Sequence, residues 1–382
     1  MKKILILLTL LAACGGSGNS GIFTSPSLIA VDSTNDRLFV LENNGVLSIL
    51  TASTREAVAS QPFVSAKLEP DVHALLPVAP LQFKVVPEGT TSRLFITGSE
   101  TNAGGNTVFN QILVLNFDGT TLAAASFSPI VLSDGDDATD ETENIPGGLE
   151  ADIAGSRLFV TDSTAGRLYT LSTTDGSEAA VSLAIAGTPN RMSLTGNHLF
   201  IANSTGTEES QLITVVNTDD FTTTTLDLDA ATDGISAATN GTGTVLLAKR
   251  ADGEGVLIRT VDTTTFDTAT AVPVSDSSAQ DGLLTSTHGI SSVAGDVVLA
   301  QTSSETIYGY VPQADGNITL ITFATDLSSF LATTLSTATR FLTGSDLYTN
   351  ASGEGITLYM AARGTGDLVF TDVGSTEVGA RF

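Results

Sequence analysis

The chain has 382 residues, and its most distinctive property is its negative charge. Lys and Arg number 16 against 42 Asp and Glu, which gives a formal net charge of −26. Such an acidic surface repels phosphate backbones, so the composition argues against nucleic acid as a partner. Apolar residues make up 41% of the chain, which excludes disorder over most of its length. One cysteine and three histidines exclude internal disulfides and most Cys- or His-based metal centres.

The N-terminus has the organisation of a secretion signal. Lys2 and Lys3 form a short positive region, residues 4–11 are almost entirely apolar, and small residues follow. The apolar run is too short to span a bilayer as a permanent helix. We therefore expect residues 1–13 to be a signal peptide.

The sequence Leu-Ala-Ala-Cys at 11–14 resembles the lipobox of bacterial lipoproteins. The resemblance implies a diacylglyceryl group on the Cys14 thiol, cleavage before Cys14, and an acyl chain such as palmitate on the new amine. Because each buried methylene contributes about 0.8 kcal/mol, several acyl chains anchor a protein durably to a membrane. The Gly- and Ser-rich stretch within 14–24 would be a flexible tether, and Gly15 after the cysteine implies the outer membrane. An ordinary signal peptide with a chance cysteine is the alternative.

An apolar run recurs along the chain and indicates a repeat. Around residue 160 the sequence RLFVTDSTAGRLYTLSTTDG alternates apolar and polar residues and inserts turn residues, which is typical of an antiparallel meander. Copies of the run stand at 37–40, 93–96, 157–160 and 198–201, with weaker copies at 245–248, 297–300 and 357–360. The shortest spacings approach the roughly 40–45 residues of a propeller blade. The longer spacings require insertions, which we place at 62–78, 133–146 and 326–337.

Seven such meanders predict an all-β fold, a seven-bladed β-propeller of four-stranded antiparallel blades over residues 25–382. A meander cannot bury both faces alone, and radial closure leaves only short, protected edges. The repeat resembles the seven-bladed propellers with YVTN-type repeats of bacterial and archaeal surfaces, best over 151–225. The absence of Trp disfavours WD40-type blades. Two stacked β-sandwiches are the alternative fold.

Three details of the propeller can also be predicted. The ring closes either through an outer strand at 21–24 or through residues 377–382, which would complete the last blade beside the first. Residues 327–337 could form one short surface helix. Five aromatic residues occupy the same phase of the recurring run and should face between the sheets: Phe39, Phe95, Phe159, Phe200 and Tyr359.

The segments that lead into the innermost strands should converge at one end of the axis, where propeller loops gather. Thr-Asp-Gly-Ile-Ser at 232–236 matches Thr-His-Gly-Ile-Ser at 287–291, and Thr-Pro-Asn-Arg-Met-Ser at 188–193 is a looser copy. This alignment predicts a ligand-binding funnel made by Asn190, Arg191, Asp233, His288 and Arg340, with Glu150 as a further member. The mixed charges suit a polar or zwitterionic ligand, and Asp233 with His288 could act as an acid–base pair. A water-filled channel mouth without function is the alternative.

A cofactor is not predicted. Residues 134–143 contain six carboxylates, and oxygen-rich loops suit Ca²⁺. Their spacing departs from that of an EF-hand, so a solvated acidic loop is the better interpretation.

These features favour a lipid-anchored, monomeric binding or scaffold module of the cell envelope, with a protein or a small polar ligand as its partner. The alternative is a propeller hydrolase or lactonase that uses the central funnel. Some propeller families are metal-assisted lactonases, and Asn190, Asp233 and Glu150 could serve as metal ligands in such an enzyme.

Overall fold

The computed structural model describes residue 23 and residues 26–43, 46–58, 79–101, 107–108, 111–132, 145–204, 212–261, 271–273, 282–286, 289–337, 342–353 and 355–381. Within these ranges the ordered elements are all β-strands, which confirms the predicted all-β class. No helix in the described part of the chain is long and apolar enough to cross a membrane.

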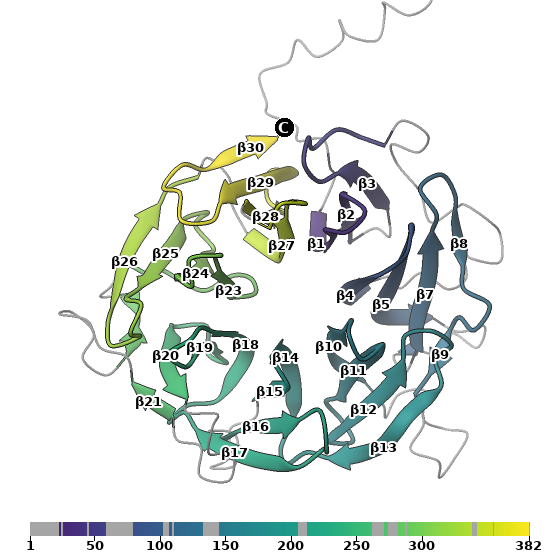
Figure 1. Ribbon diagram of the computed structural model, residues 1–382, viewed down its shortest axis with the longest axis horizontal. Helices are drawn as coiled ribbons and strands as arrows, with labels where there is room; N and C mark the ends of the chain where they lie inside the picture. Colours follow the sequence, from purple (N-terminus) through teal and green to yellow (C-terminus); the bar gives the residue numbers. More distant parts are fainter. Residues whose placement is uncertain are drawn as a thin grey trace, which may run out of the picture.

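Seven antiparallel sheets surround a central axis, and the chain visits them in order, so that each sheet is one blade of a closed ring (Figure 1). This arrangement confirms the predicted seven-bladed propeller. The innermost strands of blades 1 to 7 are β1 (Pro26–Asp32), β4 (Ala79–Glu88), β10 (Pro146–Asp152), β14 (Pro189–Thr195), β18 (Thr232–Thr239), β23 (Val298–Gln301) and β27 (Leu342–Thr349).

The remaining strands follow outward in each blade. The second strands are β2 (Arg37–Glu42), β5 (Thr91–Thr101), β11 (Arg157–Asp162), β15 (His198–Asn203), β19 (Thr244–Arg250), β24 (Ile307–Pro312) and β28 (Ile356–Ala362). The third strands are β3 (Leu47–Thr51), β7 (Gln111–Phe117), β12 (Arg167–Ser172), β16 (Leu212–Asn217), β20 (Val256–Val261), β25 (Ile318–Phe323) and β29 (Asp367–Asp372). The outer strands are β8 (Leu122–Ala124), β13 (Glu178–Ala184), β17 (Thr223–Asp227), β21 (Ala271–Pro273), β26 (Phe330–Leu335) and β30 (Gly379–Arg381).

Three blades depart from the plain four-stranded pattern. Blade 2 carries two additional short strands, β6 (Thr107–Val108) and β9 (Ile130–Val131), and blade 5 carries β22 (Leu283–Leu284) beside β20. Blade 1 has three strands within the described residues, and an isolated bridge from Leu50 to Ala57 lies on the outer side of β3.

Local hydrogen bonds within the turns explain why the strands break where they do. Between β11 and β12 the Asp162 carboxylate accepts from the backbone N–H groups of Thr164 at 2.8 Å and Ala165 at 2.9 Å. Gly166 then adopts a φ of +63°, which costs glycine little because it has no Cβ. Asx side chains commonly hold turns in this way, so the repeated Asp and Gly residues fix the strand lengths.

The core is divided into seven clusters, one at each boundary between neighbouring blades. All five aromatic residues predicted to face between the sheets are fully buried, which confirms their assignment. Four of them project from a second strand toward the following blade: Phe39 toward blade 2, Phe95 toward blade 3, Phe159 toward blade 4 and Phe200 toward blade 5. Tyr359 of blade 7 packs in the cluster shared with blade 1, which completes the ring.

Blade 6 corrects two sequence predictions. The other copies of the recurring run lie on second strands, but the weaker copy at 297–300 belongs to β23, the innermost strand, and β24 is the second, with Tyr310 buried against blade 7. The apolar run misleads because all strands of a blade share the same alternation, which does not reveal their order. The segment 327–337 is neither a helix nor an insertion, since it contains β26, which pairs with β25 from Ile318–Leu335 to Phe323–Phe330.

The ring closes through the last blade, as the second of the two predicted alternatives proposed. β30, close to the C-terminus, is the outer strand of blade 7. Between blades 7 and 1, the Val31 N–H donates to the Asp346 carboxylate at 2.8 Å and the Tyr359 hydroxyl donates to the Ala52 carbonyl. Phe23 packs into the same core cluster, and its N–H donates to the Gly366 carbonyl at 3.1 Å.

The arginine at the start of three second strands joins neighbouring blades. Each guanidinium donates to a backbone carbonyl of the following blade, so the repeated Arg of the sequence pattern has a structural role. The pairs are Arg37 with Phe117 (3.0 Å), Arg93 with Thr174 (3.1 Å) and Arg157 with Thr218.

Truncation of a boundary aromatic residue should destabilise the whole ring. We expect Phe159→Ala to lower the free energy of unfolding by about 3–5 kcal/mol, because it removes a fully buried ring between blades 3 and 4. Denaturant titration measures this loss. The control is Leu331→Ala, whose side chain is 66% exposed and should change the stability by no more than about 0.5 kcal/mol. Equal effects of the two substitutions would contradict the assignment of strand faces.

Candidate functional site

The candidate site lies on the propeller axis, where the innermost strands begin. Six of these strands carry a register shift close to their start, for example between Thr232 and Gly234 in β18 and between Pro189 and Met192 in β14. The others are in β1, β4, β10 and β27. A β-bulge re-aims the side chains at the end of a strand. The repeated bulges therefore place Asn190, Arg191 and Asp233 at the mouth of the axial channel.

The mouth is a cavity of about 460 Å³ that all seven blades line. Its charged side chains are Arg191, Asp233, Lys249 and Asp296, and its uncharged polar residues include Gln82 and Asn190. Asp233 and Lys249 form an ion pair within blade 5, with 3.3 Å between Oδ2 and Nζ. The other carboxylate oxygen of Asp233 is buried and has no hydrogen-bond partner in the described residues.

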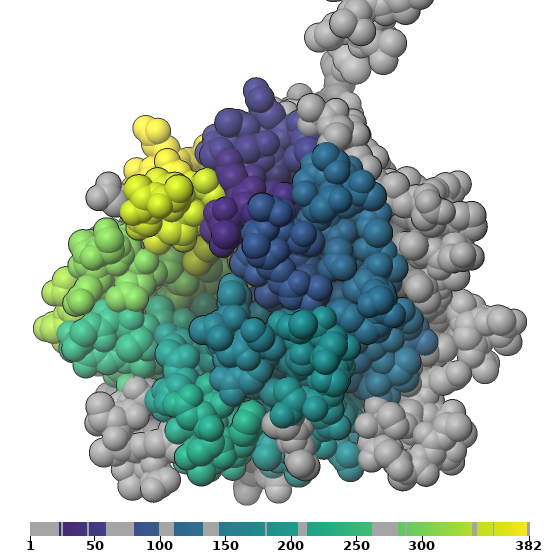
Figure 2. Space-filling view, turned by 45° about the vertical axis from the view of Figure 1, so that its right-hand side comes forward, coloured from purple at the N-terminus to yellow at the C-terminus, as the bar shows by residue number. Residues whose placement is uncertain are grey.

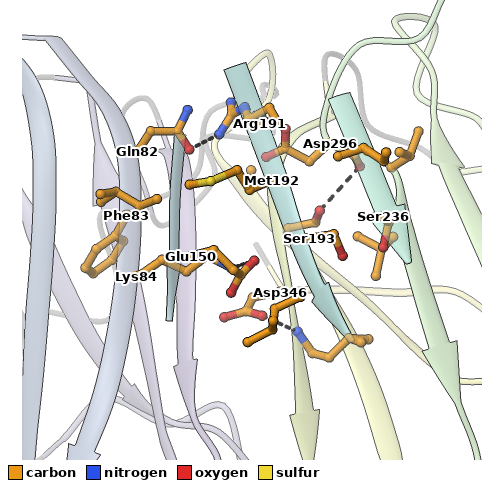
Figure 3. A pocket seen from close by; sticks show the side chains of 18 of the residues that line it. Gln82, Phe83, Lys84, Glu150, Arg191, Met192, Ser193, Ser236, Asp296 and Asp346 are labelled. Carbon is orange, nitrogen blue, oxygen red and sulfur yellow. Dashed lines mark hydrogen bonds and ion pairs between the residues drawn. The ribbon is translucent and has the colours of Figure 1, made fainter. Parts of the chain in front are cut away.

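The Arg191 side chain points toward Gln82 (Figure 3), and it lines both the mouth and a second cavity. Its Nε lies 3.3 Å from the Asp296 carboxylate of blade 6, and its Nη1 donates to the side-chain Oε1 of Gln82 in blade 2. Gln82 in turn donates to the Gly147 carbonyl at 3.2 Å. Neither blade 2 nor blade 6 adjoins blade 4 in the ring, so these contacts bridge the channel. Arg191, Gln82 and Asp296 all line both cavities.

The second cavity, the inner chamber, has a volume of about 250 Å³ and is lined by three charged side chains besides Arg191 and Asp296. The Lys84 ammonium of blade 2 lies 3.2 Å from the Glu150 carboxylate of blade 3. Asp346 of blade 7 accepts from the N–H groups of Val31 and Leu347, each at 2.8 Å. No Lys or Arg of the described chain lies within ion-pair distance of Asp346.

Burial and neighbouring charges shift the pKa values in this chamber. Burial of the carboxyl raises the pKa of Asp346 above its ordinary value, although the Lys84 ammonium and two backbone N–H groups act in the opposite direction. Burial also disfavours the charged form of Lys84, but the nearby Glu150 and Asp346 carboxylates outweigh it and raise the pKa of Lys84. Lys84 therefore stays protonated at neutral pH and holds the two carboxylates together.

Two serine hydroxyls in the chamber join innermost strands of neighbouring blades. Ser193 Oγ accepts from the Ala237 N–H at 2.9 Å, and Ser236 Oγ accepts from the Leu299 N–H at 2.9 Å. A hydroxyl that accepts one hydrogen bond still has a hydrogen to donate and a second lone pair. Both serines can therefore also bind a polar group in the chamber.

Glycine is required where the innermost strands approach one another. A Cβ on Gly148 would lie 2.6 Å from the Asn190 carbonyl oxygen, and a Cβ on Gly344 would lie 2.6 Å from the Ser27 carbonyl oxygen. No side chain fits at such distances, so these glycines set the width of the mouth.

The structure gives the positions of four of the predicted site residues. Asn190, Arg191 and Asp233 line the mouth, and Glu150 lies deeper, in the inner chamber. His288 and Arg340 lie outside the described residues, as do Cys14 and the acidic run 134–143. The match between 232–236 and 287–291 was wrong in register, because Gly289–Ser291 does not lead directly into an innermost strand. In blade 6 the corresponding position belongs to Asp296, which precedes β23.

Sequence reasoning missed Lys84, Lys249, Asp296 and Asp346. Lys84 follows Gln82 by two residues on the same strand, so the period-two rule could have placed both side chains on the axis. Lys249 lies on the second strand of blade 5, where its backbone pairs with Gly234. No pattern in the sequence marks that pairing, because the bulge in β18 shifts the register.

The residues present do not fit a central metal ion. In the described part of the chain no group of three or more His, Cys, Asp or Glu side chains is placed to hold one. Asp233 and Glu150, two of the ligands considered for a lactonase, are each paired with a lysine ammonium.

Comparison with known proteins supports the fold. No family model matches the sequence, and no curated protein resembles it significantly. The structure resembles a chain of hydrazine synthase from Kuenenia stuttgartiensis with a TM-score of 0.60 and 12% identity, over 94% of this chain and 99% of that one. It also resembles U3-55K (TM-score 0.59, 10% identity, 88% of each chain) and a streptogramin B lyase (TM-score 0.54, 14% identity, 90% of this chain and 92% of that one). At such identities the likeness shows the propeller fold alone.

Removal of Lys84 should destabilise the protein in a pH-dependent way. Breaking a fully buried ion pair costs about 3–5 kcal/mol. Because the Lys84 side chain is 33% exposed, we expect about 1–3 kcal/mol for Lys84→Met at pH 7. Without the ammonium the pKa of Asp346 rises further above its unfolded value of about 3.9. The native state then binds more protons than the unfolded state, so the loss should shrink as the pH falls through the folded pKa.

Denaturant titration of Lys84→Met and the wild type between pH 4 and pH 8 tests this expectation. The double variant Lys84→Met with Glu150→Gln is the matched control, since it also removes the carboxylate that was paired with Lys84, and it should recover part of the loss. A loss that is constant with pH would show that Lys84 acts through packing alone.

Proposed function

We propose that this chain is a lipid-anchored binding module of the cell envelope, which takes a small zwitterionic ligand at the mouth of its axial channel. The observation that carries the proposal is the arrangement around Arg191. Its guanidinium extends from blade 4 to Asp296 of blade 6 and Gln82 of blade 2. A second ion pair, Asp233 with Lys249, lines the same cavity. A ligand that carries both charges can replace these internal partners group for group.

Binding fits this arrangement better than catalysis. The Asp233 and Glu150 carboxylates each form an ion pair with a lysine, so neither lies free in the channel. A metal-assisted form of the hydrolase alternative is not favoured, because the donor set of the described residues does not fit a central metal. Paired charges on rigid strands instead give a preorganised polar surface, which costs a ligand little reorganisation.

The membrane anchor rests on the sequence at 11–14, where the only cysteine of the chain stands at the lipobox position. The acidic body is repelled by anionic lipid headgroups. The lipid and the tether at 14–24 would therefore hold the propeller to the membrane without laying it on the surface.

Lipidation can be tested directly. In bacteria grown with an alkyne analogue of palmitate, the wild-type protein should become labelled and the Cys14→Ser variant should not. The variant should also leave the membrane fraction. Equal labelling of the two proteins would refute the anchor and would leave the ligand proposal untouched.

Ligand binding at the mouth can be tested with the full chain in detergent, screened against small polar compounds by thermal shift and calorimetry. For a compound that binds, Arg191→Gln and Asp233→Asn should each lower the affinity about tenfold or more, which corresponds to about 1.4 kcal/mol. Glu178→Gln, an exposed change at the start of the outer strand of blade 3, is the matched control and should bind as the wild type does. Affinities that are unchanged in all three variants would refute the mouth as the site and direct attention to 62–78 and 133–146.

A further inference from the structure

We infer that the ligand is a dipolar amine, bound along the axis with its ammonium group in the inner chamber beside Asp346 and its acidic group at Arg191. The inference rests on the proposed function and narrows it to a ligand class and an orientation. It depends on three features of the channel: the position of Arg191, the unequal charges of the inner chamber, and the shape of the two cavities.

The position of Arg191 selects what enters the inner chamber. Its side chain lines both cavities and is held across the axis by Asp296 and Gln82 (Figure 3). A simple cation approaching from the mouth meets the guanidinium and is repelled. The carboxylate of a ligand can replace Asp296 as the partner of Arg191. A molecule that carries a carboxylate is therefore held at the Arg191 guanidinium.

The inner chamber has one carboxylate more than it has cations. Lys84 is placed against Glu150, while Asp346 is satisfied only by backbone N–H groups of the described chain. A desolvated carboxylate without a cation in direct contact favours one strongly, because a positive charge placed against it offsets its burial, and the Lys84 ammonium acts on Asp346 only from beyond ion-pair distance. The raised pKa of Asp346 reflects the same lack of compensation.

The geometry of the chamber suits an ammonium group rather than a metal ion. Ca²⁺ and similar ions need six or more oxygen ligands, and the Lys84 ammonium at this site would repel them. An ammonium group needs three acceptors, and the chamber offers the Asp346 carboxylate together with the second lone pairs of Ser193 and Ser236. The two cavities, of about 250 and 460 Å³, leave room for a chain of several atoms between the two charged ends.

The space-filling view shows that the blades pack against one another without a wide gap on the face it presents (Figure 2). The mouth, formed by the starts of the innermost strands, shares Arg191, Gln82 and Asp296 with the inner chamber, and we expect a ligand to reach Asp346 from this side.

Calorimetry with the full chain in detergent tests the inference with three probes of matched length: 5-aminopentanoate, pentanoate and pentylamine. The dipolar probe should bind about tenfold or more tightly than either single-charge probe. Asp346→Asn should weaken 5-aminopentanoate and pentylamine about tenfold and leave pentanoate unchanged. Arg191→Gln should weaken 5-aminopentanoate and pentanoate, and it should strengthen pentylamine binding because it removes the guanidinium that repels a simple cation. Shorter and longer amino acids, from glycine to 6-aminohexanoate, define the best distance between the charges.

Retained pentanoate binding shows that Asp346→Asn is folded, and Ser236→Ala provides a second, milder change in the same chamber. The inference is overturned if no amino acid of the series binds more tightly than pentanoate. It is also overturned if Asp346→Asn does not weaken the binding of 5-aminopentanoate. If no amino acid binds while other polar compounds bind in an Arg191-dependent way, the inference falls and the proposed function stands. If nothing binds at the mouth, both fall.

Discussion

The structure depends on one constraint: a single meander of three or four strands has two apolar faces and cannot bury either of them alone. Each blade therefore covers its neighbour, and the buried aromatic residue of the second strand is the centre of most boundaries, with Phe159 between blades 3 and 4 as an example. Since every boundary needs the next blade, the seventh must return to the first. The contacts of Tyr359 with Ala52 and of Val31 with Asp346 satisfy that condition.

Ring closure also determines the candidate site. The innermost strands bury their sides in the blade boundaries and begin at the same end of the axis, so their first residues must share one mouth. The bulges and glycines near these starts allow seven backbones to converge without clashes. Arg191 can then reach Asp296 and Gln82, which are far away in the sequence and belong to blades that do not touch its own. The site exists only in the closed ring, and its stability is linked to that of the whole fold.

The sequence was sufficient to predict the features that recur from blade to blade. It was insufficient for the features that occur only once in the ring. The Arg-Leu-Phe-Val pattern predicted the fold class and the buried aromatic residues, because packing requires the same residue type at the same phase in every blade. It failed in blade 6, where the apolar run at 297–300 belongs to the innermost strand β23 and the buried aromatic residue, Tyr310, lies on the next strand, β24. Asn190, Arg191 and Asp233 were found because they share a position before a strand. Contacts across the axis, such as that of Arg191 with Asp296, depend on the diameter of the ring, which no local pattern encodes.

The distribution of charge explains why a dipolar ligand fits this protein better than an ion. The chain has a net charge of −26 with only 16 basic residues, yet Lys84, Arg191 and Lys249 all lie at the axis. They face four carboxylates, those of Glu150, Asp233, Asp296 and Asp346. A free anion is repelled by the acidic body before it reaches the three cations, and a free cation is attracted to acidic groups over the whole surface, without preference for the channel. A molecule that carries both charges has little net interaction with the distant field and is stabilised only where both signs lie within its length, and the axial channel meets that condition.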